Sequence, residues 1–478
     1  AASGQRAVTS GGSAYAASSP PPAGSKPRGA LAPNGFITTT TDARSTFALD
    51  VDTGSYALTR ATLGLDQVPS PDTVRPEEFV NAFDGGYARP SARGFAISVD
   101  GAPTPFVQDG DHRLVRIGLA TRAIPPRDSK AAVLTWVVDV SGSMDEPGKL
   151  PLVKETLGLL LDELRPDDRV AIVVYGDAAR EVLASTPVKE ASRIRSAIDA
   201  LQPEGSTNVE AGLRLGYEVA RRNRVAGAIN RVVLASDGVA NVGATDPEAI
   251  LRSLSEDAGK GITLVTAGYG MGEYRDDMME RLADAGDGFY TYVDTKAEAE
   301  RVFVRNLTST LDAQALDAKA QVEWNPDAVE RYRLVGYENR AVADESLRDD
   351  SVDGGEVGAG HTVTALYEVR LVPGSSADLG TVRVHWVDTE TSKPTDLDAP
   401  VARSSLAPTF VTAAPRFQLA AVAGAFADVL RASPFASKVT LAAVADESAR
   451  VARLLGDDAD VRELASLAAK ARDISARP

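Results

Sequence analysis

The sequence of 478 residues contains no cysteine. This absence excludes disulfide bonds, thiolate metal sites, cysteine nucleophiles and thiol redox switches. Histidine is scarce as well, because His112, His361 and His385 are the only three, and they lie in scattered segments. A site built from three histidines is therefore disfavoured, and a metal site in this chain would be built mainly from oxygen ligands.

Long basic runs and long apolar runs are also missing. The formal net charge is −16, so the field of the whole chain would repel nucleic acid and anionic membrane surfaces. No apolar stretch approaches the roughly 18 to 20 residues that span a bilayer. We therefore expect a soluble protein without a transmembrane segment that binds neither nucleic acid nor a membrane surface.

The chain is long enough for two or three domains. Residues 1–40 are rich in Ser, Gly, Ala and Pro, which cannot bury a core, so they predict a disordered tether. The first residue is Ala rather than Met, and we expect that a targeting segment was removed from the precursor.

Residues 131–313 alternate strong apolar runs with amphipathic helical patterns. The predicted strands are VLTWVVDV, VAIVVYG, RVVLASDG, ITLVTAGYG and GFYTYVD. The predicted helices cover residues 149–164, 191–201, 208–223, 247–258, 275–285 and 296–313. This alternation is typical of a parallel sheet covered on both faces, so it predicts a doubly wound α/β domain.

The segments on either side of this domain read mainly as β-strands. Residues 41–130 predict a helix near Phe79 and alternating strands, and residues 314–410 predict four further strands. We infer that the α/β domain is inserted into a β-sandwich that both flanks build. Residues 411–478 are rich in Ala and Leu with helical spacing, and predict a small helical segment.

Five carboxylate and hydroxyl side chains fall at the carboxyl edge of the predicted sheet. The first strand ends WVVDVSGSM, which places Asp139, Ser141 and Ser143 in one turn, where residues two apart can face the same way. GSTN places Thr207 in a loop before a helix, and LASDG places Asp237 at the end of another strand. Ligands of open α/β sheets bind at this edge, so we expect the five side chains to face a common point.

These five side chains are all hard oxygen donors. They favour magnesium, with manganese or calcium as neighbours, over zinc or copper. Two carboxylates neutralise a divalent ion, but five short side chains do not fill an octahedral shell. We expect an open position for water or for an Asp or Glu carboxylate of a protein or peptide partner. Taken singly, DVSGS reads as a helix cap and SDG as a turn, and only their combination favours a metal site.

The pattern D-x-S-x-S, a distant Thr and a later SDG in this strand order resemble the metal-ion-dependent adhesion site of the von Willebrand factor type A domain. The resemblance implies a Rossmann-like fold and a bound Mg²⁺ ion. It also implies that Ser141 and Ser143 bind the ion directly, whereas Asp139 and Thr207 bind directly or through water according to conformational state. Asp237 would bind through water.

The flanks carry a second resemblance. Their segments STFALDVDTGSYALTR, RPEEFVNAFD, VDGGEVGAGHTVTALYEV and PRFQLAAVAGAFADVLR are similar to segments around this domain in a bacterial family of secreted or lipid-anchored proteins. The resemblance covers residues 45–475. It implies an extracytoplasmic location and a precursor with a secretion signal or a lipid anchor.

These observations predict a cation-dependent binding or adhesion protein rather than an enzyme. A magnesium-dependent hydrolase is one alternative, but it needs a general base beside the metal, and neither His nor Lys lies in the three motif turns. An accessory factor of a ring ATPase is another alternative, and the β flanks and the tether argue against it.

The predicted last helix, 296–313, leads into the flanking strands. Two hypotheses follow: ligand binding displaces this helix, or the helix stays in place and the protein is a rigid scaffold.

Overall fold

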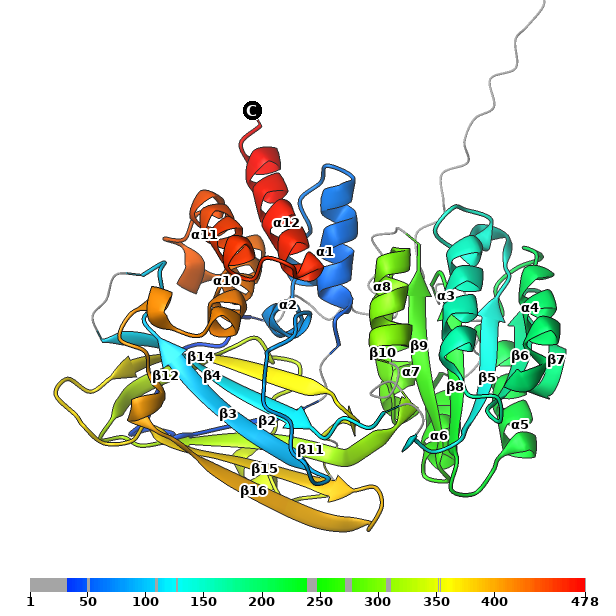
Figure 1. Cartoon of the computed structure of the whole chain (residues 1–478), viewed down its shortest axis with the longest axis horizontal. Helices are drawn as coiled ribbons and strands as arrows, with labels where there is room; N and C mark the ends of the chain where they lie inside the picture. Colours follow the sequence, from blue (N-terminus) through cyan, green and yellow to red (C-terminus); the bar gives the residue numbers. More distant parts are fainter. Residues whose placement is uncertain are drawn as a thin grey trace, which may run out of the picture.

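The structure is a computed structural model that describes residues 32–49, 52–107, 111–125, 128–238, 247–270, 277–306, 311–350, 352 and 354–477. Figure 1 shows an α/β domain beside a β-sandwich, with a group of helices packed on the sandwich. Of the predicted tether, residues 1–31 lie outside the described residues. Strand pairing begins within its last residues, at β1 (Ile37–Thr38).

The α/β domain contains a six-stranded sheet in the order β10-β9-β8-β5-β6-β7. Its strands are β5 (Ala132–Asp139), β6 (Arg169–Tyr175), β7 (Ala179–Pro187), β8 (Ile229–Ser236), β9 (Ile262–Tyr269) and β10 (Phe289–Val293). Every residue of β5 is buried, which is expected of a central strand covered on both faces. The adjacent pairs run parallel except for β6 with β7, which is antiparallel.

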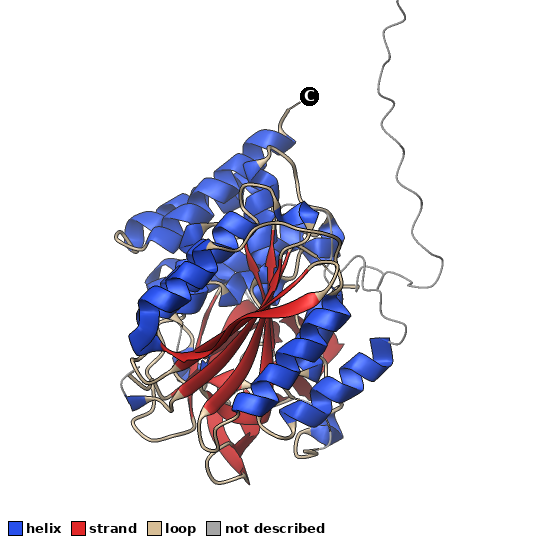
Figure 2. Cartoon of the chain, turned by 90° about the vertical axis from the view of Figure 1, so that its right-hand side faces the viewer, coloured by secondary structure: helices blue, strands red, loops and turns tan. Residues whose placement is uncertain are grey.

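Helices cover both faces of this sheet. They are α3 (Leu150–Glu163), α4 (Ala191–Asp199), α5 (Val209–Asn223), α6 (Pro247–Ala258), α7 (Asp277–Ala285) and α8 (Lys296–Glu300). Trp136 and Val138 of β5 share a core with α3, α4 and α8, whereas Val137 shares the opposite core with α5, α6 and α7. Figure 2 shows the twisted sheet between its helices. The predicted doubly wound fold is confirmed.

One segment differs from the sequence prediction, and one predicted helix contains a π-helical turn. The segment 177–190, which lies between the predicted strand VAIVVYG and the predicted helix at 191–201, contains β7, a half-buried edge strand whose pairing with β6 needs only one apolar face. The predicted helix at 296–313 begins as α8, which continues into a π-helical turn at Arg301–Arg305, and Leu311 is again helical; residues 307–310 lie outside the described residues. From Ala313 the chain forms β11 (Ala313–Trp324), which pairs within the sandwich.

The sandwich combines strands from before and after the α/β domain. One sheet has the order β1-β12-β14-β4-β3, and the other has β13-β11-β15-β16 with β2 also paired to β11. The remaining strands are β2 (Arg44–Ala48), β3 (Phe95–Ala102), β4 (His112–Thr121), β12 (Val329–Val335), β13 (Val357–Gly358), β14 (Thr362–Leu371), β15 (Gly380–Asp388) and β16 (Lys393–Val401). Leu119 pairs with Val363, and Ala48 pairs with Lys319. These pairs confirm the predicted insertion.

The C-terminal segment forms three helices that join two helices of the N-terminal flank. They are α10 (Pro415–Leu430), α11 (Leu441–Leu454), α12 (Ala459–Ser475), α1 (Gly54–Gly64) and α2 (Pro76–Asn81). Tyr56 and Phe79 from the N-terminal flank share a core with Phe417 and Phe426 of α10. The N-terminal flank and the C-terminal helices therefore fold as one unit.

Across the described part of the chain, no helix combines the length and the apolar character that a membrane span requires.

Candidate metal centre

The turn after β5 brings together three of the predicted ligands. Asp139 ends β5 with no exposed surface, and its Oδ1 accepts a hydrogen bond of 2.8 Å from the backbone N–H of Ser141. This bond reverses the chain into a 3₁₀ turn at Gly142–Met144. The hydroxyls of Ser141 and Ser143 consequently lie 3.1 Å apart, with Ser141 buried and Ser143 exposed.

The loop that carries Thr207 is held against this turn by backbone hydrogen bonds. The N–H of Gly142 donates to the carbonyl of Gly205 at 3.0 Å, and the N–H of Glu204 donates to the carbonyl of Val140 at 2.5 Å. Thr207 follows in the chain and is half-buried. Its position is therefore set by the main chain around it.

Two neighbours of Thr207 fix the ends of its loop. Asp177, in the loop after β6, accepts a hydrogen bond of 2.7 Å from the N–H of Ser206. Hydrogen bonding from Ser206 lowers the pKa of Asp177, so its carboxylate is ionised at neutral pH. Asn208 caps α5 by accepting a bond from the N–H of Ala211. The loop is thus fastened on both sides of Thr207.

The third loop of the candidate centre follows the end of β8. The hydroxyl of Ser236 donates to Oδ2 of Asp139 at 2.8 Å, which joins the end of β8 to the end of β5. Asp237 follows directly, and its charge acts on Asp139. The structure thus brings the five predicted residues from three loops to one edge of the sheet.

The electrostatics of Asp139 suit a cation. Burial raises the pKa of Asp139, and hydrogen bonds from Ser141 and Ser236 oppose this effect only in part. The hydroxyl of Tyr175 also donates to Asp139, at 3.3 Å. A divalent ion would supply the opposite charge that a buried carboxylate lacks.

The five candidate ligands suit a hard cation, because their hydroxyl oxygens as well as their charged carboxylates can bind it. The described residues hold no cluster of three or more His, Cys, Asp or Glu side chains that could bind a metal. The candidate centre has two carboxylates, Asp139 and Asp237, and three hydroxyls. Such a set matches magnesium, manganese or calcium, which bind oxygen.

Sequence reasoning missed four residues at this centre, which are Tyr175, Asp177, Ser236 and Lys149. Tyr175 is the last residue but one of the predicted strand VAIVVYG, and Ser236 lies within LASDG, so their positions near strand ends could have indicated them. Lys149 is different. Its Nζ lies 3.0 Å from Oδ2 of Asp237, and nothing in the segment DEPGKL indicates that this lysine folds back to the centre.

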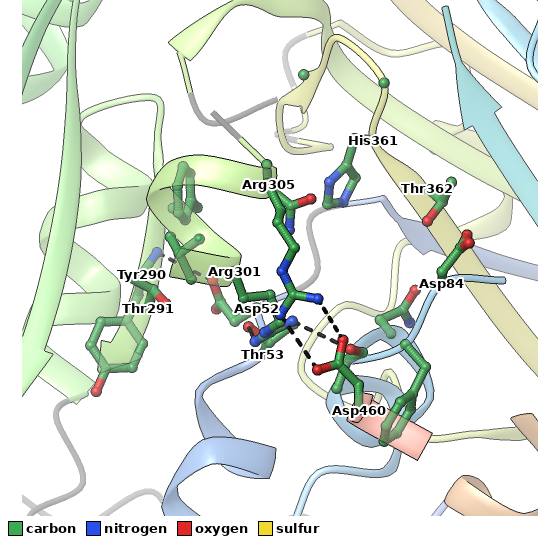
Figure 3. Close-up of a pocket in the computed structure, with 18 of the residues that line it drawn as sticks. Asp52, Thr53, Asp84, Tyr290, Thr291, Arg301, Arg305, His361, Thr362 and Asp460 are labelled. Atoms are coloured by element: carbon green, nitrogen blue, oxygen red, sulfur yellow. Dashed lines mark hydrogen bonds and ion pairs between the residues drawn. The ribbon is translucent and has the colours of Figure 1, made fainter. Parts of the chain in front are cut away.

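A separate cavity of about 290 Å³ lies where the α/β domain meets the flanks. Tyr290 and Arg305 line it from the α/β domain, whereas Asp52, His361 and Asp460 line it from the flanks and α12 (Figure 3). None of the five predicted ligands lines this cavity. It belongs to the interface between the two parts rather than to the candidate centre.

Three family models match the chain. Residues 134–305 match the von Willebrand factor type A domain, and residues 28–116 match a model described as von Willebrand factor. Residues 309–377 match a model described as uncharacterized protein YfbK, C-terminal. The matches therefore include the α/β domain and parts of both flanks.

Known proteins are similar over different lengths. Uncharacterized protein YfbK from Escherichia coli (strain K12) is 35% identical over 414 residues, which covers 82% of this chain and 72% of that protein. Uncharacterized protein sll0103 from Synechocystis sp. is 26% identical over 314 residues, or 63% and 71% of the two chains. Human inter-alpha-trypsin inhibitor heavy chain H3 is 26% identical over 175 residues, or 35% and 19%.

Solved structures resemble the chain too. The von Willebrand factor type A protein from Catenulispora acidiphila has 18% sequence identity and a TM-score of 0.44, and the match covers 76% of this chain and 88% of that one. The identity to YfbK extends well beyond the α/β domain. The chain therefore belongs to the bacterial family of von Willebrand factor type A domain proteins that includes YfbK.

Proposed function

We propose that this protein is an extracytoplasmic, metal-ion-dependent binding or adhesion protein that engages an acidic side chain of a protein or peptide partner. Type A domains mediate protein interactions. One observation carries the metal-dependent part. Three loops from separate strands bring the two carboxylates and three hydroxyls to one edge of the sheet, and the Ser141 and Ser143 hydroxyls lie only 3.1 Å apart.

Asp139 and Asp237 would supply the charge that holds a Mg²⁺ ion, or a Mn²⁺ or Ca²⁺ ion in its place. Ser141, Ser143 and Thr207 would supply hydroxyl ligands. The bound ion would act as a fixed positive charge that accepts a further oxygen ligand. Ser143 is exposed and Thr207 is half-buried, so a partner could reach the ion from this side.

The partner chemistry follows from charge. Two carboxylates neutralise a divalent ion without giving the centre excess negative charge. A carboxylate from a partner can therefore join the shell and form a strong charge-assisted contact. Specificity would come from the loops around the centre.

The side chains at the centre support binding rather than hydrolysis. Neither histidine nor lysine lies in the three turns, but Lys149, which lies outside them in the sequence, contacts Asp237. Although partial burial acts to lower the pKa of Lys149, hydrogen bonds to Asp237 and Glu146 raise it overall. Lys149 is therefore protonated at neutral pH and does not serve as a general base.

The first experiment is isothermal titration calorimetry of the purified protein with Mg²⁺ and Mn²⁺. Wild-type protein is expected to bind one ion, and Asp139→Ala is expected to lose this binding. Asp162→Ala is the matched control, because Asp162 pairs with Arg195 on the surface, and both side chains are well exposed. No metal binding by the wild type, or full binding by Asp139→Ala, would overturn the proposal.

The second experiment addresses the partner. Immobilised protein is exposed to a peptide library with Mg²⁺ or with a chelator, and bound peptides are resynthesised with Asn or Gln in place of Asp or Glu. Binding should require both the metal and the carboxylate. Metal-dependent turnover in phosphatase or peptidase screens that Asp237→Ala abolishes would favour the hydrolase instead.

The proposed location is supported by the Ser-, Gly- and Pro-rich segment at residues 1–31. Such a segment suits a tether between a folded protein and an envelope attachment point. Protease added to cells whose outer layers have been permeabilised should degrade the protein while a cytoplasmic marker survives. Protection together with the cytoplasmic marker would favour the accessory factor of a ring ATPase.

A further inference from the structure

Lys149, just before α3, points back into the candidate metal centre. Its Nζ lies 3.0 Å from Oδ2 of Asp237 and 3.2 Å from Oε2 of Glu146, and it donates to the carbonyl of Ser143 at 3.0 Å. An ammonium group has three N–H donors, and these three oxygens satisfy them. The side chain is only 14% exposed, so this lysine is held in place.

The path of the Lys149 side chain depends on Gly270, which follows β9. A methyl group added at Gly270 would lie 2.6 Å from Cε and 2.8 Å from Cγ of Lys149, and the φ of Gly270 is +88°. Both the tight approach and the positive φ require glycine here. Gly270 thus leaves the space through which the lysine reaches Asp237.

The ammonium of Lys149 and a divalent ion would draw on the same carboxylate. Asp237 is one of only two carboxylates in the candidate donor set, and its side chain is 8% exposed. Two cations beside one partly buried carboxylate repel each other more strongly than they would in water. Metal binding therefore competes with the Lys149 contact.

We propose that Lys149 is a tethered competitor of the metal ion, which holds Asp237 until a cation displaces it and thereby lowers the metal affinity of the centre. This inference rests on the metal-dependent function proposed above. A positioning role is the alternative, because the bond from Lys149 to the Ser143 carbonyl also fastens the Ser141–Ser143 turn. The two roles predict opposite changes in metal affinity when Lys149 is replaced, since removing a competitor tightens metal binding and removing a support weakens it.

The test is calorimetric titration of Mn²⁺ into chelator-treated wild-type protein, Lys149→Met and Lys154→Met. Methionine keeps an unbranched stem and removes the charge. Lys154→Met is the matched control, because Lys154 lies on α3 and its Nζ donates to the carbonyl of Asp199, outside the centre. Lys149→Met is expected to bind Mn²⁺ at least about tenfold more tightly, which equals about 1.4 kcal/mol, and Lys154→Met should bind as the wild type does.

The outcomes separate this inference from the function on which it rests. Wild-type binding with equal or weaker binding by Lys149→Met would overturn the competition and leave the metal-dependent function intact. No binding by either protein would overturn both. Tighter binding by Lys149→Met, with wild-type affinity in Lys154→Met, would support both the competition and the metal-dependent function.

Thermal unfolding gives an independent readout. Without Lys149, the negative charge of Asp237 acts on the buried Asp139 and has lost its contact with a cation, so metal-free Lys149→Met should unfold at a lower temperature than the wild type. Mn²⁺ should then raise the unfolding temperature of Lys149→Met more than that of the wild type. Lys149→Arg keeps the charge and should resemble the wild type. A loss of stability that Mn²⁺ does not restore would contradict the competition.

Discussion

The loop edge of the α/β domain and its β10 side use different interactions. At the loop edge, backbone hydrogen bonds and small hydroxyls fasten three turns around Asp139, and Ser143 is exposed. At the β10 side, which faces the flanks in Figure 1, charged side chains cross between the two parts. Arg60 of α1 pairs there with Asp294 and Glu298 of the α/β domain.

The charged contacts at the β10 side are largely buried. The side chain of Arg60 is 13% exposed and that of Glu298 is 1% exposed, and Arg60 also pairs with Glu463 of α12 at 3.1 Å. Further along, Arg75 of the N-terminal flank and Arg340 of the second flank both pair with Glu280 of α7. A buried charge that loses its partner is costly, so these pairs hold one arrangement of the two parts.

This difference assigns ligand binding to the loop edge and stability to the β10 side. The loop edge can change its ligands without disturbing a core, whereas the β10 side resists movement. Displacing α8 on ligand binding would separate Glu298 from Arg60, and Arg301 from the Thr53 hydroxyl to which it donates at 3.0 Å. The interface therefore favours the rigid-scaffold hypothesis over a moving last helix.

The largest effect is expected at Arg60. Arg60→Met leaves Asp294 and Glu298 buried without their cation from the flank, so the free energy of unfolding should fall by about 3 kcal/mol. Urea denaturation measures this loss, and Lys at the same position should recover part of it. Calorimetry should give the wild-type affinity for Mn²⁺. A large change in that affinity would show that the two regions are coupled.

The second effect concerns pH and the cavity at the interface. Burial and the nearby Arg89 lower the pKa of His361 to about 4, whereas an unfolded chain has a value of about 6.5. Between these values the unfolded chain binds the extra proton, so stability is lost as the pH falls. The loss from pH 7 to pH 5 should reach about 2 kcal/mol at most.

His361→Gln should remove this contribution. Urea denaturation of both proteins at pH 7 and pH 5, without metal, measures the difference in pH dependence. Parallel losses in the wild type and the variant would show that His361 contributes nothing. The affinity for Mn²⁺ at pH 7 should be the same in both, because His361 lies at the interface and not at the loop edge.

The third effect lies at the loop edge. Thr207→Ala should weaken Mn²⁺ binding about tenfold, or by about 1.4 kcal/mol, because one hydroxyl ligand is lost. The free energy of unfolding should change by less than about 0.5 kcal/mol, since backbone bonds hold this loop. Thr207→Ser keeps the hydroxyl and is the control. A destabilised Thr207→Ala with unchanged metal affinity would reverse the proposed division between the two regions.

The smallest effect is expected at Arg305, which pairs with Asp460 at 2.9 Å across the cavity in Figure 3. Their side chains are 51% and 36% exposed, so water screens the pair. A double-mutant cycle with Arg305→Ala and Asp460→Ala should give a coupling of less than about 1 kcal/mol. A larger coupling would mean that exposed pairs also hold the two parts together.

Much of the fold was predictable because it follows local patterns. The apolar runs at 133–140 and 170–176 became parallel strands, and the helical spacing at 208–223 became α5. The edge strand β7 was missed because a half-buried strand has a weaker pattern than a central one.

The candidate centre was predicted for a similar reason. The short segments DVSGS and LASDG are enough to indicate a turn and a strand end, and parallel strands bring their carboxyl ends to one edge of the sheet. Nothing in these segments indicated that Asp177 would fasten the Ser206 backbone. That bond joins two loops, and it depends on how β6 and α5 are placed.

By itself, the sequence determined the type of ligand at this edge: Asp139, Ser141, Ser143, Thr207 and Asp237 offer only oxygen, whatever surrounds them. Only the tertiary structure decided that Lys149 reaches Asp237 past Gly270 and that Arg60 connects the α/β domain to the flanks. The physical reason is one of range. Periodicity and turn chemistry act between neighbours in the chain, whereas the partner of a long charged side chain depends on which distant segments pack beside it.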